Sequence, residues 1–188
     1  MKKYIILSLV ALLYGQFSFS MTEYEKEDQE RQERIERDAK SKDFWNAILA
    51  DDGNVLKDFL DKKPDTDVNI PFRPIESSAL HYLAGGKNTD WGRNYGNVKK
   101  AILLFDKGAN VDARNVLGET PLHEAIRTRD IPFIRLLLLH NADLALKTRG
   151  AQLTPLMLAE KIRAIGEGET LEKEIIVDLL KNAANRKR

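Results

Sequence analysis

The chain has 188 residues, of which 43% are hydrophobic and 31% are charged, and its formal net charge is +1. This length is sufficient for one domain with a hydrophobic core, and the near-neutral balance predicts no general attraction to nucleic acid or to an anionic membrane. Cysteine is absent, which excludes disulfide bonds, thiolate metal sites, a cysteine nucleophile and a lipoprotein anchor.

Residues 1–20 have the order of a secretory signal peptide. Two lysines precede an apolar run over residues 4–14, and Ser18 and Ser20 follow with the spacing of a signal-peptidase site. We expect cleavage before Met21. The run has about 11 residues, whereas a membrane span needs roughly 20, so no stable anchor is expected after cleavage. A buried N-terminal helix is the alternative. The short basic start favours a Gram-negative bacterium and a periplasmic or secreted protein.

Residues 21–42 form a charged lead-in that is predicted to be helical. Neither proline nor glycine interrupts it, and acids recur four positions before bases, which is the favourable orientation on a helix. The pairs are Glu27 with Arg31, Glu30 with Arg34, Glu33 with Arg37, and Glu36 with Lys40. Such a helix serves either as a partner-binding arm or spacer, or as a solvated lead-in without a partner.

The rest of the sequence contains an internal repeat. Residues 120–125 read Thr-Pro-Leu-His-Glu-Ala, and 34 positions later residues 154–159 read Thr-Pro-Leu-Met-Leu-Ala. Residues 78–81, Ser-Ala-Leu-His, are a shorter copy. A second apolar helical pattern and a turn follow each copy, and the turn at residues 108–113 reads Gly-Ala-Asn-Val-Asp-Ala. A period of this length predicts stacked helical repeats.

These motifs resemble the ankyrin-repeat family. The resemblance implies an all-α fold, an ankyrin-repeat solenoid of about four helix-turn-helix repeats with short β-hairpin-like tips, over residues 43–188. The repeats are expected at about 43–69, 70–114, 115–146 and 147–185. Because a single repeat cannot bury both of its helices, the copies must stack, and degenerate end repeats are expected as caps.

The helix ends follow ordinary local chemistry. Thr120 is suited to cap a helix, and Pro121 fits the first helical position, where its missing N–H has no consequence. Gly108 and Asn141 suit the left-handed conformation that ends a helix.

The sequence departs from the family in two places. Residues 85–96 are inserted between the two helices of the second repeat, and residues 164–171 lengthen the same connection in the fourth. Both insertions are predicted to be loops on one edge of the stack. The first carries Trp91 and Tyr95, which are expected either as exposed binding anchors or, for Trp91, as a lid over the local core.

The resemblance also implies a contact surface, made of the hairpin tips and the exposed face of the first helix of each repeat. The tips correspond to residues 71–76, 114–119 and 147–153, called here the second, third and fourth tips. The expected contact residues are Phe72, Arg73, Ile75, Val116, Leu117, Glu119 and Arg149 on the tips, and Tyr82, Glu124, Arg127, Thr128 and Leu158 on the helices.

No motif in the chain indicates catalysis. His81 and His123 occupy the same position of two repeats, where the family uses histidine for scaffold hydrogen bonds, and His140 lies in a turn. No cluster has the spacing of metal ligands, and no nucleophile has an evident base. We therefore expect no catalytic residue, no metal and no cofactor.

The function predicted from these features is that of an exported module, favoured as a monomer, that binds a protein partner as an inhibitor, immunity protein or protective scaffold. Nucleic acid is not expected as a ligand. The alternatives are a secreted effector acting on a host protein, a small-molecule binder or enzyme built on the long inter-helix loops, and a structural spacer.

Overall fold

The computed structural model describes residues 29–32, 41–50, 52–72, 76–85, 91–162 and 167–186, with backbone only for residues 91–96, 167 and 169. The chain divides into two units, Met1–Lys40 and Ser41–Arg188. In the first unit, residues 29–32 are helical and exposed, as the charged lead-in predicts, and its remaining residues up to 40 lie outside the described part. The expected signal peptide also lies outside it.

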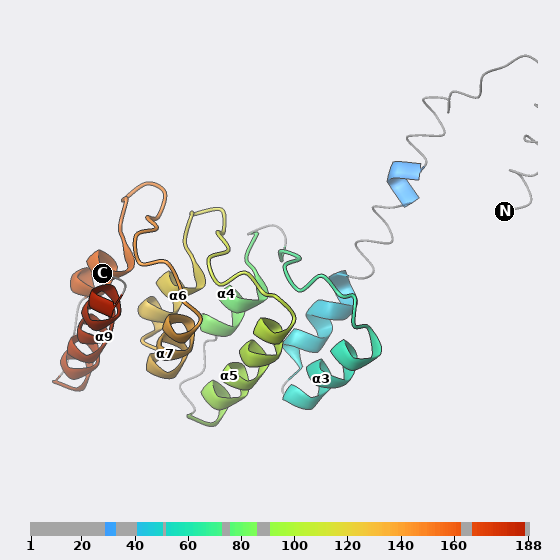
Figure 1. Cartoon of the computed structure of the whole chain (residues 1–188), viewed down its shortest axis with the longest axis horizontal. Coiled ribbons are helices and arrows are strands. Elements are labelled where there is room, and N and C mark those ends of the chain that lie inside the picture. The colour runs from blue at the N-terminus through green and yellow to red at the C-terminus, as the bar shows by residue number, and fades with distance from the viewer. Residues whose placement is uncertain are drawn as a thin grey trace, which may run out of the picture. The chain divides into compact units, whose positions relative to one another are not determined.

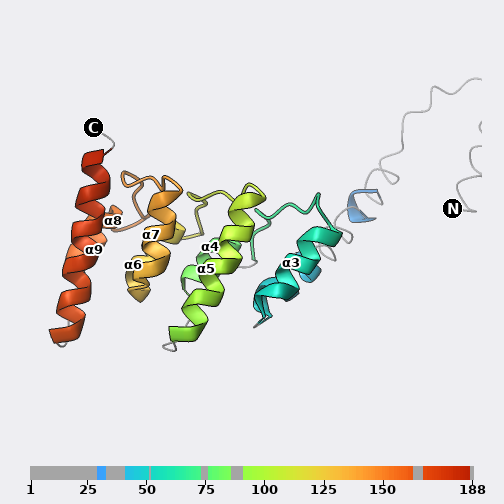
Figure 2. The same cartoon turned by 60° about the horizontal axis from the view of Figure 1, so that its bottom comes forward.

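The second unit is built from consecutive helix pairs (Figure 1). The pairs are residues 41–49 with α3 (Gly53–Lys62), α4 (Ala79–Ala84) with α5 (Trp91–Asp106), α6 (Pro121–Thr128) with α7 (Ile131–Leu139), and α8 (Pro155–Lys161) with α9 (Glu167–Arg186). The first helices pack in one row, α4 on α6 and α6 on α8. The second helices pack in a parallel row, α3 on α5, α5 on α7 and α7 on α9 (Figure 2). This arrangement confirms the expected all-α stack of repeats.

The starts of α6 and α8 and the ends of α5 and α7 form where the sequence predicts. Thr120 and Thr154 are N-caps in extended conformation, each followed by a proline at the start of the helix. Gly108 has a φ of 81° and Asn141 a φ of 62°, so both take the left-handed conformation that ends α5 and α7. These two turns reverse the chain toward the next repeat.

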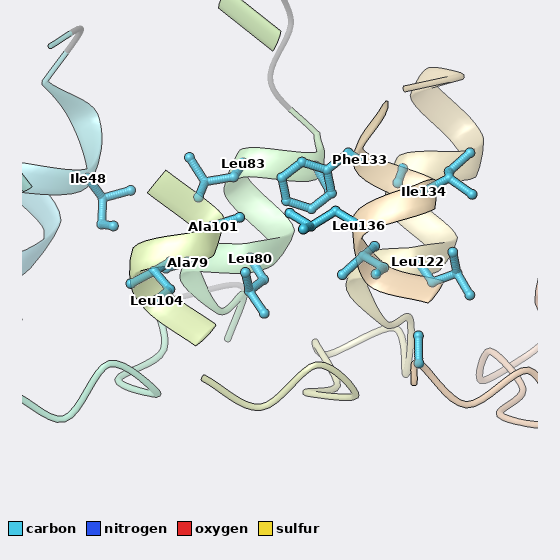
Figure 3. Packing of buried hydrophobic residues seen from close by; sticks show 14 of the residues in the cluster. Ile48, Ala79, Leu80, Leu83, Ala101, Leu104, Leu122, Phe133, Ile134 and Leu136 are labelled. Carbon is cyan, nitrogen blue, oxygen red and sulfur yellow. The ribbon is translucent and has the colours of Figure 1, made fainter. Parts of the chain in front are cut away.

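One apolar cluster runs through the stack (Figure 3). Leu80 of α4, Leu122 of α6 and Phe133 of α7 are at most 1% exposed, and they fill the space between the two helical rows. Deleting a buried leucine of this kind destabilises a protein by about 2–5 kcal/mol, because the cavity is only partly filled by relaxation.

A polar ladder joins consecutive turns. The side-chain oxygen Oδ1 of Asn69 accepts a hydrogen bond from the backbone N–H of Asn110 at 2.7 Å. One repeat further on, Oδ1 of Asp112 accepts from the N–H of Asp143 at 2.9 Å. Ala145 occupies the equivalent position of the third repeat and has no acceptor in its side chain, so the ladder does not continue into the fourth repeat.

Three connections differ from the expectation. Residues 91–96 were predicted as loop, but α5 begins at Trp91, and residues 167–171 of the second predicted insertion belong to α9. The turn that the repeat pattern predicts after the second helix of each copy is also replaced by helix in the fourth repeat, because α9 continues to Arg186. Each glycine destabilises a helix by about 1 kcal/mol, so the glycines of residues 91–96 favour the prediction of a loop. The helix nevertheless begins at Trp91, and α5 as a whole packs on α3 and α7. Asn182 holds the position that Asn141 has in the third repeat, but it lies within α9 and does not take a positive φ.

Candidate protein-interaction surface

The hairpin tips project from one edge of the stacked helices (Figure 1). Phe72 pairs with Ser77 in a β-bridge, and the equivalent backbone bonds are Asn115 N–H to the Glu119 carbonyl and Thr148 N–H to the Leu153 carbonyl, both 3.0 Å. The tips are therefore hairpin-like, as expected. They carry large exposed apolar side chains: Phe72 is 41% exposed, Val116 38% and Leu117 59%.

The third and fourth tips are bonded to one another. The Arg149 backbone N–H donates to the Leu117 carbonyl at 2.8 Å, and its Nη1 donates to the Val116 carbonyl at 3.1 Å. In the opposite direction, Nη2 of Arg114 donates to the Lys147 carbonyl at 2.5 Å. The two tips are thus held as one platform.

Histidines connect two of the first helices, α4 and α6, to the tip of the next repeat. Nε2 of His81 lies 2.8 Å from the Glu119 carbonyl oxygen, and Nδ1 lies 3.2 Å from the Ser78 backbone nitrogen. Because a carbonyl oxygen only accepts, Nε2 carries the proton and Nδ1 accepts from Ser78. His123 repeats the arrangement, with Nε2 3.1 Å from the Leu153 carbonyl oxygen and Nδ1 3.2 Å from the Thr120 nitrogen.

Both histidines are held neutral. Burial lowers the pKa of the His81 imidazole below its ordinary 6.5, and this outweighs the opposing effects of the Glu119 carbonyl and carboxylate. Burial also lowers the pKa of His123, against the Leu153 carbonyl and the Glu119 carboxylate. With both nitrogens bonded, each neutral imidazole connects its helix to the tip of the next repeat. His140 stacks on Phe105 at 3.8 Å between ring centroids.

An aromatic cluster that the sequence did not reveal joins the first and second repeats. Trp45 is 4% exposed and occupies the position that histidine holds in the next two repeats. Its ring lies 4.9 Å from that of Phe72 and 6.3 Å from that of Tyr82, measured between centroids. Phe72 and Tyr82 are 41% and 46% exposed, so they form a supported aromatic surface. The alignment of the repeats could have predicted this cluster, because Trp45 takes the place of His81 and His123 in the first repeat.

A charged group lies on the first-helix face, the exposed side of α4, α6 and α8. Arg127 forms an ion pair with Glu119 through Nη2 and a longer contact of 3.8 Å from Nε to Glu124. Burial raises the pKa of Glu124, while Arg127 opposes the shift. Thr128 donates its hydroxyl to the Ala84 carbonyl at 2.8 Å, which joins α6 to α4.

The predicted contact residues differ in their exposure and in their place in the structure. Glu119 is buried at 7% exposure and paired with Arg127, so it belongs to the scaffold of its tip and is not accessible there, contrary to expectation. Arg73 and Ile75 lie outside the described residues. Trp91 and Tyr95 stand on the first turns of α5, not on a loop, and their side chains are not among those described. The exposed or half-exposed members that come together are Phe72, Tyr82, Val116, Leu117, Glu124, Arg127, Thr128, Arg149 and Leu158.

Within the part of the chain that the structure describes, no group of three or more histidine or carboxylate side chains is placed to hold a metal ion. The helices in that part are also each too short or too polar to cross a membrane. What the described surface does offer is an apolar and charged face on a rigid support.

A family model described as ankyrin repeats, in three copies, matches residues 44–148. Ankyrin repeat domain-containing protein 37 of Bos taurus is 31% identical over 85 residues, which are 45% of this chain and 48% of that protein. The Mus musculus protein of the same name is 29% identical over 85 residues, with the same coverage. The Caenorhabditis elegans homolog of ankyrin repeat and LEM domain-containing protein 1 is 36% identical over 80 residues, 43% of this chain and 10% of that protein. The matched segments thus span about half or less of each relative.

Proposed function

The chain belongs to the ankyrin-repeat family, and on this premise we propose that it binds a partner protein through its tips and first-helix face after export from the cytoplasm. Ankyrin repeats generally mediate protein–protein interactions. The mode of action we propose is occupancy of the partner, as an inhibitor, immunity protein or protective scaffold, without catalysis.

The observation that carries this proposal is the line of exposed apolar side chains over adjacent tips and first helices. Phe72, Val116 and Leu117 lie on two neighbouring tips, and Tyr82 and Met157, both more than 40% exposed, lie on α4 and α8. Exposed aromatic and aliphatic groups on a rigid support are typical binding anchors. Hydrogen bonds between the repeats fix this surface in advance, which reduces the ordering cost of binding.

The export part of the proposal rests on the order of residues 1–20: basic, apolar, then small. A fusion of residues 1–25 to a reporter that is active only outside the cytoplasm tests it in a Gram-negative host. Reporter activity that is lost when Leu9 and Leu12 are changed to arginine supports export. Cytoplasmic retention of the intact fusion would contradict it.

The binding part is tested by affinity capture with the mature chain from Met21 as bait, using periplasmic and culture fractions of the source organism. We expect one dominant partner at near-equal stoichiometry. The variant Phe72→Ala/Tyr82→Ala/Leu117→Ala should lose it. The matched control is Leu139→Ala, because Leu139 is 76% exposed but lies on the second-helix row. Equal capture by the triple variant would overturn the assignment of the surface.

A further inference from the structure

Two arginines from different repeats converge on one glycine at the third tip. A methyl group placed on Gly118 would meet Cγ of Arg149 at 2.7 Å and Nη2 of Arg114 at 2.9 Å. Gly118 has a φ of 69°, which other residues rarely adopt. The absence of a side chain at this position therefore lets both arginines lie against the same backbone.

Backbone carbonyls hold the two arginines in a reciprocal arrangement. Arg114 of the third tip donates to the Lys147 carbonyl of the fourth, and Arg149 of the fourth donates to the Val116 carbonyl of the third. Each guanidinium has five N–H donors in a rigid fork, so one bond to a carbonyl fixes its position and leaves donors for a ligand.

The local charge is not balanced by carboxylates of the described residues. The ion pairs among those residues are Lys63 with Asp43 and Arg127 with Glu119 and Glu124, and none involves Arg114, Lys147 or Arg149. The carboxylate on the same tip, Glu119, is turned to Arg127 and buried. Two guanidiniums are thus gathered at one edge of the molecule.

An apolar flank adjoins this charged site. Leu117 is 59% exposed and Val116 38% exposed, and the carbonyls of both residues accept hydrogen bonds from Arg149. A ligand that pairs a carboxylate with a neighbouring apolar side chain complements both features, because guanidinium–carboxylate pairs are charge-assisted and geometrically specific.

We propose that Arg114 and Arg149 bind an aspartate or glutamate side chain in an exposed segment of the partner protein, while Leu117 contacts an apolar side chain beside it. This inference rests on the proposed function and adds to it the chemistry of the partner. A protein is favoured over nucleic acid because the net charge of +1 and the short cationic edge do not provide the extended basic stripe that a phosphate backbone needs.

The test is selection of peptides from a random displayed library on the mature full-length chain. The wild-type chain should enrich sequences with an acidic residue next to an aliphatic one. The variant Arg114→Gln/Arg149→Gln should lose this enrichment, and Arg135→Gln should keep it, because Arg135 is an exposed arginine on α7. For a synthesised selected peptide, we expect the double variant to bind about ten- to a hundredfold more weakly. Replacing the acidic residue of the peptide by the corresponding amide should weaken binding by the same factor. The affinity of the Arg149→Lys variant should lie between those of the wild-type chain and the double variant.

The outcomes separate this inference from the proposed function. If selected peptides depend on Phe72, Tyr82 and Leu117 but are unaffected by loss of the two arginines, the surface binds proteins and the carboxylate site is wrong. If inorganic phosphate or single-stranded DNA displaces the peptides and binds through the arginines with equal strength, the inference is also wrong. A library that yields no sequence-specific binder would overturn both. Circular dichroism of each variant, compared with Arg135→Gln, verifies that the fold is retained.

Discussion

Replacing His123 by alanine should weaken the junction between the third and fourth repeats. His123 is fully buried, with Nδ1 accepting from the Thr120 N–H and Nε2 donating to the Leu153 carbonyl of the next repeat. The Thr120 N–H is fully buried, so it loses its partner without access to water, whereas Leu153 is half-buried and its carbonyl is partly resolvated. An unpaired buried polar group costs about 1–3 kcal/mol, and the lost imidazole leaves a cavity, so we expect about 2–4 kcal/mol in total.

Urea unfolding followed by far-ultraviolet circular dichroism measures this loss. Because stacked repeats are stabilised by their nearest neighbours, the effect should concentrate at one junction. Amide hydrogen exchange in α8 and α9 should therefore accelerate more than exchange in α3. His123→Gln, which keeps a donor and an acceptor, should recover part of the stability.

The matched control is Met157→Ala, because Met157 takes the equivalent position in the fourth repeat but is 44% exposed. A change within about 0.5 kcal/mol is expected there, as is usual for exposed positions. If His123→Ala lowered the free energy of unfolding by less than about 1 kcal/mol, the histidine would not be a junction connector and the magnitude derived from its bonds would be refuted.

Three further predictions concern the same scaffold. The pKa values of His81 and His123 are lowered on folding, so the unfolded chain binds more protons than the folded chain. Their contribution to stability is complete above about pH 6.5 and should decline as the pH falls through the folded-state values. Urea unfolding midpoints measured between about pH 7.5 and pH 5.5 should therefore decrease on acidification, and a midpoint that rises would contradict this prediction. Gly118→Ala should lower the free energy of unfolding by at least about 1–2 kcal/mol more than Gly150→Ala does. Both glycines have a positive φ, but only Gly118 has arginine atoms where the methyl group would lie. Equal decreases of the melting temperature in the two variants would contradict the convergence of the arginines. Lys100→Met should lower the free energy of unfolding in urea by about 1–3 kcal/mol. The buried ammonium of Lys100 donates to the Ile48 and Ala50 carbonyls at the end of the first helix, and these acceptors would lose their partner. A decrease no larger than that of Lys99→Met would contradict this role.

The features of this fold that the sequence predicted are those set by local chemistry. A threonine before a proline specifies a helix start, and glycine or asparagine after an apolar run specifies its end, as Thr120, Gly108 and Asn141 illustrate. The repeated pattern then requires stacking, because the apolar faces have no other partner. The start of α5 at Trp91 escaped prediction, because Gly92 and Gly96 favour a loop on local grounds, whereas the helix runs through both of them.

The candidate surface was predicted in part for the same reason. Exposure of Phe72, Val116 and Leu117 follows from their place on hairpin tips and could be inferred from the resemblance. The burial of Glu119 depends on Arg127, eight residues along the chain and on a different element, so its own neighbourhood in the sequence gave no sign of it. The convergence of Arg114 and Arg149 likewise arises only when two repeats are stacked.

The most direct test of the central claim, that this protein binds a partner through its tips and first helices, is hydrogen exchange of the captured complex against the free chain. We predict that amide exchange becomes slower at residues 114–119 and 147–153 and in α4. Exchange in the second helices α3, α5 and α7 should be unchanged. Protection confined to those second helices, or to the charged residues 22–42, with the tips exchanging as in the free chain, would contradict the claim.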